Sequence, residues 1–270
     1  MNTKPDQPIG IFDSGVGGLT VASEIKRLLP DESLIYFGDT AHLPYGDKSK
    51  ETVTYYSERI AEYLLSQNCK VIVIACNTAS ANAYESVVKL VGSNAIVVNV
   101  IDPVIEHVVT GRKTSGIGVI GTKGTINSAT YEKKILEKNS ALQVFSMATP
   151  LFVPMIEEGF IFDDISNAII RSYLSKDQLK DIDTLILGCT HYPIIKNQIS
   201  KFYNFKVDVI DSSKIVATYL RETLLKHNLN IQKNDPSYLF YVSDYTDFFR
   251  TISKLFFEED IELKKLNFWN

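Results

Sequence analysis

The sequence has little of what marks several large classes of protein. Its 3 cysteines in 270 residues exclude a small scaffold held together by disulfides, and an odd number that cannot all pair within one chain fits a reducing compartment. The 28 basic residues are outnumbered by 32 acidic ones, so no overall positive charge attracts nucleic acid. No segment approaches the roughly 20 consecutive apolar residues that cross a bilayer. We therefore expect a cytoplasmic protein whose partners include neither nucleic acid nor membrane.

Short β-branched segments alternate with longer amphipathic segments, a pattern typical of parallel α/β sheets. Two of the short segments, 71–75 and 184–188, are continuously apolar, as expected of strands that are covered on both faces. The predicted strands are 9–12, 33–37, 71–75, 96–100, 116–120, 142–146, 184–188, 207–210 and 238–242. The predicted helices include 19–29, 52–66, 80–91 and 125–138, and the hydroxyl of Thr122 can cap the last of these.

A weak internal repeat divides the chain in two. Residues 9–14 align with 117–122, and residues 71–78 align with 184–191 at nearly the same spacing. Chance similarity between buried strands would explain the apolar residues that the two copies share, but not a cysteine directly after a strand in both copies. We therefore predict an α/β fold with two pseudo-symmetric, doubly wound parallel-sheet lobes that face each other. Residues 1–100 and 210–270 would form the first lobe, with 101–209 inserted as the second, because the chain from Val207 onward has no counterpart in the repeat.

Two glycine-containing turns follow predicted strands, where parallel sheets place their ligands. In the first, Asp13 to Gly18, free N–H groups at the start of the next helix suit a small carboxylate. The spacing matches neither the dinucleotide fingerprint nor the phosphate-binding loop. The glycines could equally serve only the turn. In the second, Gly38 to Gly46, Asp39 either orients its neighbours or simply forms a turn.

Two of the cysteines lie where a predicted strand ends and a helix begins. At Cys76 and Cys189, helix N–H groups and adjacent hydroxyls are expected to stabilise a thiolate and lower the thiol pKa from about 8.5. Cys69 precedes its strand and is expected to be a small buried apolar residue.

Three chemistries could use such a pair of cysteines. A redox dithiol would normally have the Cys-x-x-Cys spacing, which is absent. A metal site would need more ligands than Cys76, Cys189 and His191 provide. The remaining possibility is a pair of proton carriers on opposite faces of one substrate carbon, as the inversion of a stereocentre requires.

Eight motifs in one order identify a resemblance. They are residues 10–21, 36–41, 44–46, 75–81, 121–126, 152–158, 187–193 and 211–213. Through them the sequence, from about residue 9 to 215, closely resembles the glutamate racemases of the cofactor-independent aspartate/glutamate racemase superfamily.

The resemblance implies interconversion of L- and D-glutamate without pyridoxal phosphate, metal or nucleotide, by a homodimer that supplies D-glutamate for peptidoglycan synthesis and cell shape. It also implies two lobes with the active site between them. Cys76 would exchange the proton of D-glutamate and Cys189 that of L-glutamate. The implied catalytic residues are Cys76, Cys189, Asp13, His191 and Glu157, with Glu158 a rival for the last position. The implied substrate-binding residues are Asp13, Ser14, Pro44, Tyr45, Gly46, Cys76, Asn77, Thr78, Thr122, Cys189, Thr190 and His191.

Alternatives to this function remain at the level of sequence. A sister enzyme acting on aspartate, a hydantoin or maleate would share the motifs, and a non-catalytic protein that binds an amino acid would share the fold. The other histidines, His42, His107 and His227, lack comparable surroundings, and the phenylalanine-rich stretch 248–257 is interpreted as core packing.

Overall fold

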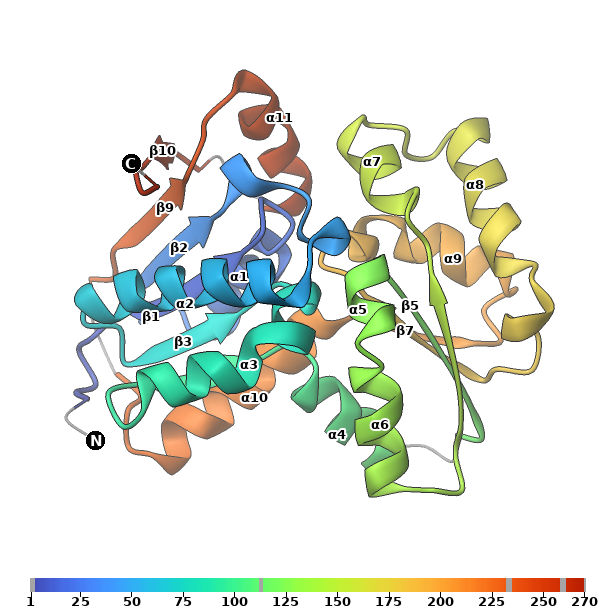
Figure 1. Cartoon of the computed structure of the whole chain (residues 1–270), viewed down its shortest axis with the longest axis horizontal. Helices are drawn as coiled ribbons and strands as arrows, with labels where there is room; N and C mark the ends of the chain where they lie inside the picture. Colours follow the sequence, from blue (N-terminus) through green and yellow to red (C-terminus); the bar gives the residue numbers. More distant parts are fainter. Residues whose placement is uncertain (1–2, 112–113, 232–234, 258–260, 270) are drawn as a thin grey trace.

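Two parallel β-sheets form the frame of the protein in a computed structural model that describes residues 3–111, 114–231, 235–257 and 261–269 (Figure 1). The first sheet has the strand order β10-β9-β2-β1-β3-β4 and the second β6-β5-β7-β8. Every paired strand in both sheets is parallel, so the predicted α/β class is confirmed. The strands are β1 (Ile9–Asp13), β2 (Leu34–Gly38), β3 (Val71–Ile74), β4 (Ile96–Asn99), β5 (Gly116–Gly121), β6 (Gln143–Ala148), β7 (Thr184–Gly188), β8 (Asp208–Ile210), β9 (Tyr238–Val242) and β10 (Leu263–Lys265).

The two sheets share one topology. The order β2-β1-β3-β4 in the first sheet is repeated as β6-β5-β7-β8 in the second. The strands that the sequence repeat aligns, β1 with β5 and β3 with β7, hold equivalent places in these orders. The expectation that the chain from Val207 has no counterpart is wrong, because β8 pairs with β7 as β4 pairs with β3. Strands β9 and β10 extend only the first sheet.

Helices cover both faces of each sheet because alternate side chains of its strands are apolar in both directions. On β1, Phe12 faces α2 (Lys50–Ser66) and α3 (Asn77–Val91), whereas Ile11 faces α1 (Leu19–Leu28) and α10 (Ser212–Lys226). The second sheet lies between α4 (Asp102–Thr110) with α6 (Thr130–Lys138) and a layer of three helices. These three are α7 (Phe152–Glu157), α8 (Asp164–Leu174) and α9 (Lys196–Phe202).

The predicted helix 125–138 is wrong in one respect. It is two helices, α5 (Lys123–Asn127) and α6, separated at Ala129, whose φ of 55° is left-handed. The left-handed residue cannot continue a right-handed helix. Thr122 does cap the first piece, since its Oγ1 accepts a hydrogen bond from the backbone N–H of Thr125 at 3.2 Å.

The phenylalanine-rich stretch forms α11 (Asp247–Phe256). Ile252, Phe256 and Phe257 are buried, which confirms the core-packing interpretation for the inner face, whereas Phe248 is exposed. Within the described ranges, none of the helices combines the length and the apolar character that a membrane span requires.

A buried ion pair joins the amino ends of the strands, opposite the end that carries the sequence motifs. Lys70, just before β3, places its Nζ 2.5 Å from Glu32 Oε2 and 3.0 Å from the carbonyl oxygen of Leu229, and it also contacts the carbonyl of Pro5. The side chains of Lys70 and Glu32 are 0% and 3% exposed. The pair therefore ties several separate chain segments together at the base of the first sheet.

Replacing Lys70 should destabilise the fold strongly, because it leaves the carboxylate of Glu32 buried without its cation. We expect Lys70→Met to lower the free energy of unfolding by about 3–5 kcal/mol, measured by urea denaturation. The matched control is Lys138→Met, which removes the exposed pair with Glu106 and should leave the free energy of unfolding nearly unchanged, because solvent screens an exposed ion pair. Equal effects of the two substitutions would contradict this account of the pair.

Candidate active site

A cavity of about 300 Å³ lies at the carboxyl ends of the strands, between the two lobes. Its walls come from the segments that follow β1, β2 and β3 in the first lobe and β5, β6 and β7 in the second. Cys76 and Cys189 both line it, one from each lobe, and they are 5% and 7% exposed. The arrangement therefore brings the two repeated strand–cysteine elements to one enclosed space.

The structure brings the residues predicted from the sequence together around this cavity. Of the predicted set, Asp13 alone does not line it and lies behind the wall, fully buried. Those that line it are Ser14, Pro44, Tyr45, Gly46, Cys76, Asn77, Thr78, Thr122, Glu157, Cys189, Thr190 and His191. Sequence reasoning missed Leu43, Asp47, Lys123, Thr149, Pro150, Val153 and Pro154. Most of these flank or lie inside the motifs, but side chains such as Leu43 and Val153 carry no chemical signal of their own.

Cys76 is held at the start of a helix by the chain around it. It is the N-cap of α3, and its Sγ accepts a hydrogen bond from the N–H of Ala79 at 3.4 Å. The thiol also lies 3.6 Å from the Oγ of Ser14, to which it donates. These are the helix N–H and hydroxyl partners that the sequence predicts for a cysteine in this position.

The predicted lowering of the Cys76 pKa is nevertheless wrong. Burial and the nearby carboxylate of Asp13 raise the pKa of Cys76 to about 12, because they outweigh the hydrogen bonds with Ala79 and Ser14. Cys76 is therefore a thiol at neutral pH. Burial also raises the pKa of Cys69 to about 12, and that residue packs in the core between α2 and β1, as expected.

His191 connects Cys189 to a carboxylate. Its Nδ1 lies 3.8 Å from Cys189 Sγ, and its Nε2 lies 3.0 Å from Glu157 Oε1. Burial disfavours the imidazolium, but the interactions with Cys189 and Glu157 outweigh it and raise the pKa of His191 to about 10. At neutral pH a cation therefore lies beside the Cys189 sulfur. The neighbouring Glu158 is exposed, so Glu157 is the carboxylate that the geometry pairs with His191.

The glycine turn after β1 holds a carboxylate of the protein itself. Asp13 Oδ2 accepts hydrogen bonds from the N–H groups of Gly15 at 3.3 Å and Gly18 at 2.8 Å. Burial raises the pKa of Asp13 against the lowering effects of His191 and these N–H groups. The anion expected at this turn is thus Asp13. Gly17 has a different role, since a Cβ there would lie 2.5 Å from the ring of His191.

Neutral donors from both lobes face the cavity. The hydroxyl of Tyr131 donates to Asn77 Oδ1 at 2.8 Å, which fixes the orientation of the Asn77 amide group. The buried Nδ2 of the same amide has no hydrogen-bond partner among the described residues. The hydroxyls of Thr78 and Thr122, one from each lobe, lie 2.9 Å apart. An amide N–H and hydroxyls in these positions can bind a carboxylate without adding charge beside the sulfurs.

The remaining histidines differ in their surroundings. His107 and His227 are exposed and do not line the cavity, as expected. His42 does not line the cavity either, but it is not isolated, because its Nδ1 lies 3.0 Å from Asp39 Oδ2 and its ring stacks on Tyr56. In the part of the chain that the structure describes, no three His, Cys, Asp or Glu side chains converge as metal ligands would.

Known proteins resemble the chain over nearly its whole length. Residues 13–220 match the family described as Asp/Glu/Hydantoin racemase. The glutamate racemase of Chlorobaculum parvum is 44% identical over 250 residues, which cover 92% of each protein. The crystal structure of glutamate racemase from Francisella tularensis in complex with D-glutamate has a TM-score of 0.92 and 39% identity, and covers 98% of this chain and 99% of that one. The structure from Thermus thermophilus in complex with β-chloro-D-alanine has a TM-score of 0.88 and 36% identity, and covers 98% of each chain. The resemblance inferred from the motifs is confirmed.

The contact between His191 and Glu157 can be tested by titration. Glu157→Gln removes the negative charge that favours the imidazolium, so the pKa of His191 should fall by about 1–3 units. The imidazolium would then be lost at a lower pH than in the parent protein. The measurement is the pH dependence of the His191 ring signals in NMR spectra.

Glu158→Gln is the matched control for this titration, because it removes a carboxylate one residue away that does not contact His191. It should leave the pKa of His191 within about 0.3 units of the parent value, a shift small beside the effect of a charge in direct contact. A shift of equal size in both variants would contradict the assignment of Glu157.

Proposed function

The chain belongs to the Asp/Glu/Hydantoin racemase family, and on that premise we propose that it interconverts L- and D-glutamate by moving the α-proton between Cys76 and Cys189. It is thus an isomerase. Its assignment as a glutamate racemase follows from its similarity to glutamate racemases over more than nine-tenths of its length. The single observation that supports the two-thiol mechanism best is that two buried cysteines, one from each lobe, line one cavity.

The surroundings of the two sulfurs suit the two roles that the reaction needs. The raised pKa of Cys76 keeps this residue a thiol that can donate a proton. Cys189 Sγ lies 3.8 Å from Nδ1 of the His191 imidazolium, and we assign it the role of the base that accepts one. In one direction the Cα–H bond of the substrate breaks as Cys189 gains the proton. Cys76 then gives its own proton to the opposite face, and the configuration at Cα inverts.

After one turnover the thiol and the thiolate have exchanged places, which is the starting state for the other enantiomer. Burial and Asp13 raise the pKa of Cys76, whereas Cys189 has the imidazolium of His191 beside it, so the charges next to the two sulfurs are of opposite sign. On this basis we propose that Cys189 takes the proton of L-glutamate and Cys76 that of D-glutamate, as the resemblance implies.

The carbanion-like transition state needs strong stabilisation, because an amino-acid α-proton is only weakly acidic. We propose that the substrate carboxylates bind the Asn77 amide, the Thr78 and Thr122 hydroxyls, and backbone N–H groups of the cavity wall. Fixed donors in a site closed to water stabilise developing charge without reorganisation. Ser14, Pro44, Tyr45, Gly46 and Thr190 line the same cavity and complete the proposed binding site.

Further proposals concern the setting of the reaction. The product D-glutamate would supply peptidoglycan synthesis, with the enzyme working as a homodimer in the cytoplasm. The three cysteines are free thiols, which agrees with a reducing compartment. We also propose that residues 1–100 and 210–270 form the first lobe and residues 101–209 the second. The contact of α10 with α1 supports the placement of α10 in the first lobe.

Deuterium exchange tests the two-thiol mechanism. In D₂O the parent protein should place deuterium at Cα of both enantiomers with inversion. Cys76→Ala and Cys189→Ala should each slow racemisation by about 10²–10⁴-fold, because each removes one acid–base group. A single remaining base can return deuterium only to the face from which it took the proton. Cys189→Ala should therefore still exchange D-glutamate, and Cys76→Ala should still exchange L-glutamate, both without inversion.

Cys69→Ala is the matched control, because Cys69 is a buried cysteine outside the cavity, and it should racemise at the parental rate. Racemisation at the parental rate by both active-site variants would overturn the mechanism. Binding of glutamate without any exchange in the parent protein would favour a non-catalytic binding protein. Faster turnover of aspartate than of glutamate would favour a sister enzyme.

A further inference from the structure

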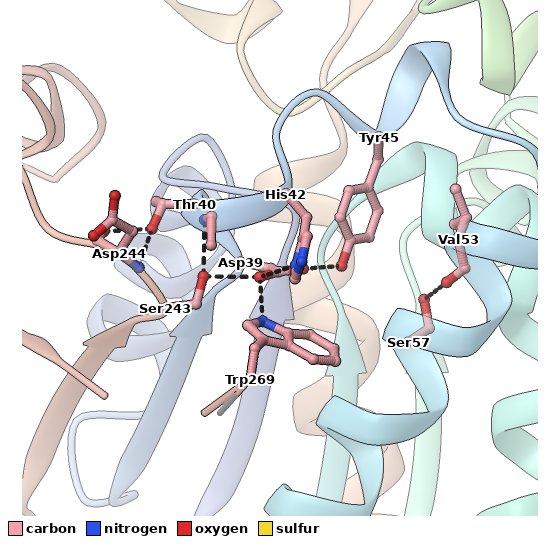
Figure 2. Close-up of polar contacts among 10 residues, drawn as sticks. Asp39, Thr40, His42, Tyr45, Val53, Ser57, Ser243, Asp244 and Trp269 are labelled. Atoms are coloured by element: carbon pink, nitrogen blue, oxygen red, sulfur yellow. Dashed lines mark hydrogen bonds and ion pairs between the residues drawn. The ribbon is translucent and has the colours of Figure 1, made fainter. Parts of the chain in front are cut away.

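A buried carboxylate outside the cavity organises the loop after β2. Asp39 is 0% exposed, and its two oxygens accept hydrogen bonds from four side chains (Figure 2). Oδ2 accepts from the Tyr45 hydroxyl at 2.6 Å, and Oδ1 accepts from Ser243 Oγ at 2.8 Å and Trp269 Nε1 at 2.7 Å. His42 Nδ1 lies between them, 3.0 Å from Oδ2 and 3.1 Å from Oδ1. Such a shell compensates the carboxylate for the loss of water.

These donors come from parts of the chain that lie far apart in sequence. Ser243 directly follows β9, and it also accepts a hydrogen bond from the N–H of Ala41 at 2.9 Å. Beside it, Thr40 Oγ1 accepts from the N–H of Asp244 at 2.9 Å and donates to the carbonyl oxygen of the same residue at 2.5 Å. The loop after β2 is therefore fastened to the end of β9 over several residues (Figure 2).

Tyr45 carries this fastening to the cavity. Tyr45 is 1% exposed, and burial together with the charge of Asp39 raises the pKa of its hydroxyl well above 10, so the hydroxyl stays a donor. Residues 43–47 all line the cavity. Gly46 packs against the other lobe, since a Cβ there would lie 2.7 Å from Thr122 Cβ. A fixed Tyr45 therefore fixes the stretch of backbone that closes the cavity against the second lobe.

Trp269 is placed by aromatic contacts. Its ring meets His42 edge-on at 4.7 Å and Tyr56 at 5.1 Å between ring centroids. The adjacent Phe268 packs on Phe37 at 4.9 Å and on Tyr63 at 5.6 Å. Edge-to-face pairs of this kind have defined geometry. The contacts of Trp269 orient its ring so that the indole N–H points at Asp39 (Figure 2), whereas those of Phe268 add packing of the segment on the first lobe.

We propose that Asp39 is a positioning residue for the substrate loop 43–47, and that Trp269, from the segment after β10, is its anchor. Neither residue lines the cavity, so both act through Tyr45. A loop that is ordered before the substrate arrives does not lose its freedom on binding, which favours affinity. This inference rests on the proposed function, since the loop is taken to bind glutamate.

The test separates positioning from support of the fold. Trp269→Phe keeps an aromatic ring but removes the N–H that donates to Asp39, so KM for both glutamate enantiomers should rise about 3- to 10-fold, the size of effect expected for the loss of one typical hydrogen bond, with kcat within about twofold. Phe268→Leu is the matched control, because it removes packing from the same segment and leaves every hydrogen bond of Asp39. It should lower Tm and leave KM unchanged.

A double-mutant cycle tests the route through Tyr45. If Trp269 acts by way of Asp39 and Tyr45, then Tyr45→Phe with Trp269→Phe should have the KM of Tyr45→Phe alone. Additive effects, an unchanged KM for Trp269→Phe, or an equal rise in KM for Phe268→Leu would each overturn the proposal.

A readout without substrate keeps the two proposals apart. Amide hydrogen exchange of residues 40–47 should be faster in Trp269→Phe than in Phe268→Leu or the parent protein, because the loop opens more often. Unchanged exchange would overturn the positioning role even if glutamate is the substrate. If exchange is faster in Trp269→Phe but the parent protein does not racemise glutamate, the positioning role stands and only the proposed function is refuted.

Discussion

The meeting of two parallel sheets at the carboxyl ends of their strands is the constraint on which the rest of the structure depends. In such sheets the chain leaves every strand at the same edge, so the residues that follow β1, β3, β5 and β7 gather in one place. Because both sheets repeat one topology, a cysteine at the end of β3 has a counterpart at the end of β7, and the cavity between the lobes receives both. The site is thus a direct consequence of the repeated strand order.

The symmetry of the backbone is not shared by the charges. Cys76 lies near the buried Asp13, which disfavours its thiolate, whereas Cys189 lies beside an imidazolium held by Glu157. One topology therefore carries two different electrostatic environments, which is the basis of the proposed division of roles between the two cysteines. The two environments meet where the ring of His191, from the second lobe, packs against Gly17 of the first lobe. This approach requires glycine, because any side chain at position 17 would displace the ring.

Much of the fold could be predicted because its strands are buried on both faces and read as continuous apolar runs. The break in the helix after Thr122 could not, since Ala129 gives no sign of a left-handed conformation, and β10 has only three residues, two of them exposed lysines. The motifs identified the residues around the cavity, but the pKa of Cys76 depends on burial and on a carboxylate from another strand. The bond between Asp39 and Trp269 joins residues separated by 230 positions, which no local pattern indicates.

The most direct test of the account is a crystal structure of the protein with glutamate bound. The account requires that the Sγ atoms of Cys76 and Cys189 lie on opposite faces of the substrate Cα, each within about 3–3.5 Å in the reactive geometry. It also requires that the loop of Tyr45 closes over the same molecule. A complex in which both sulfurs lie on one face of Cα, or in which either is held out of reach of it, would contradict the account.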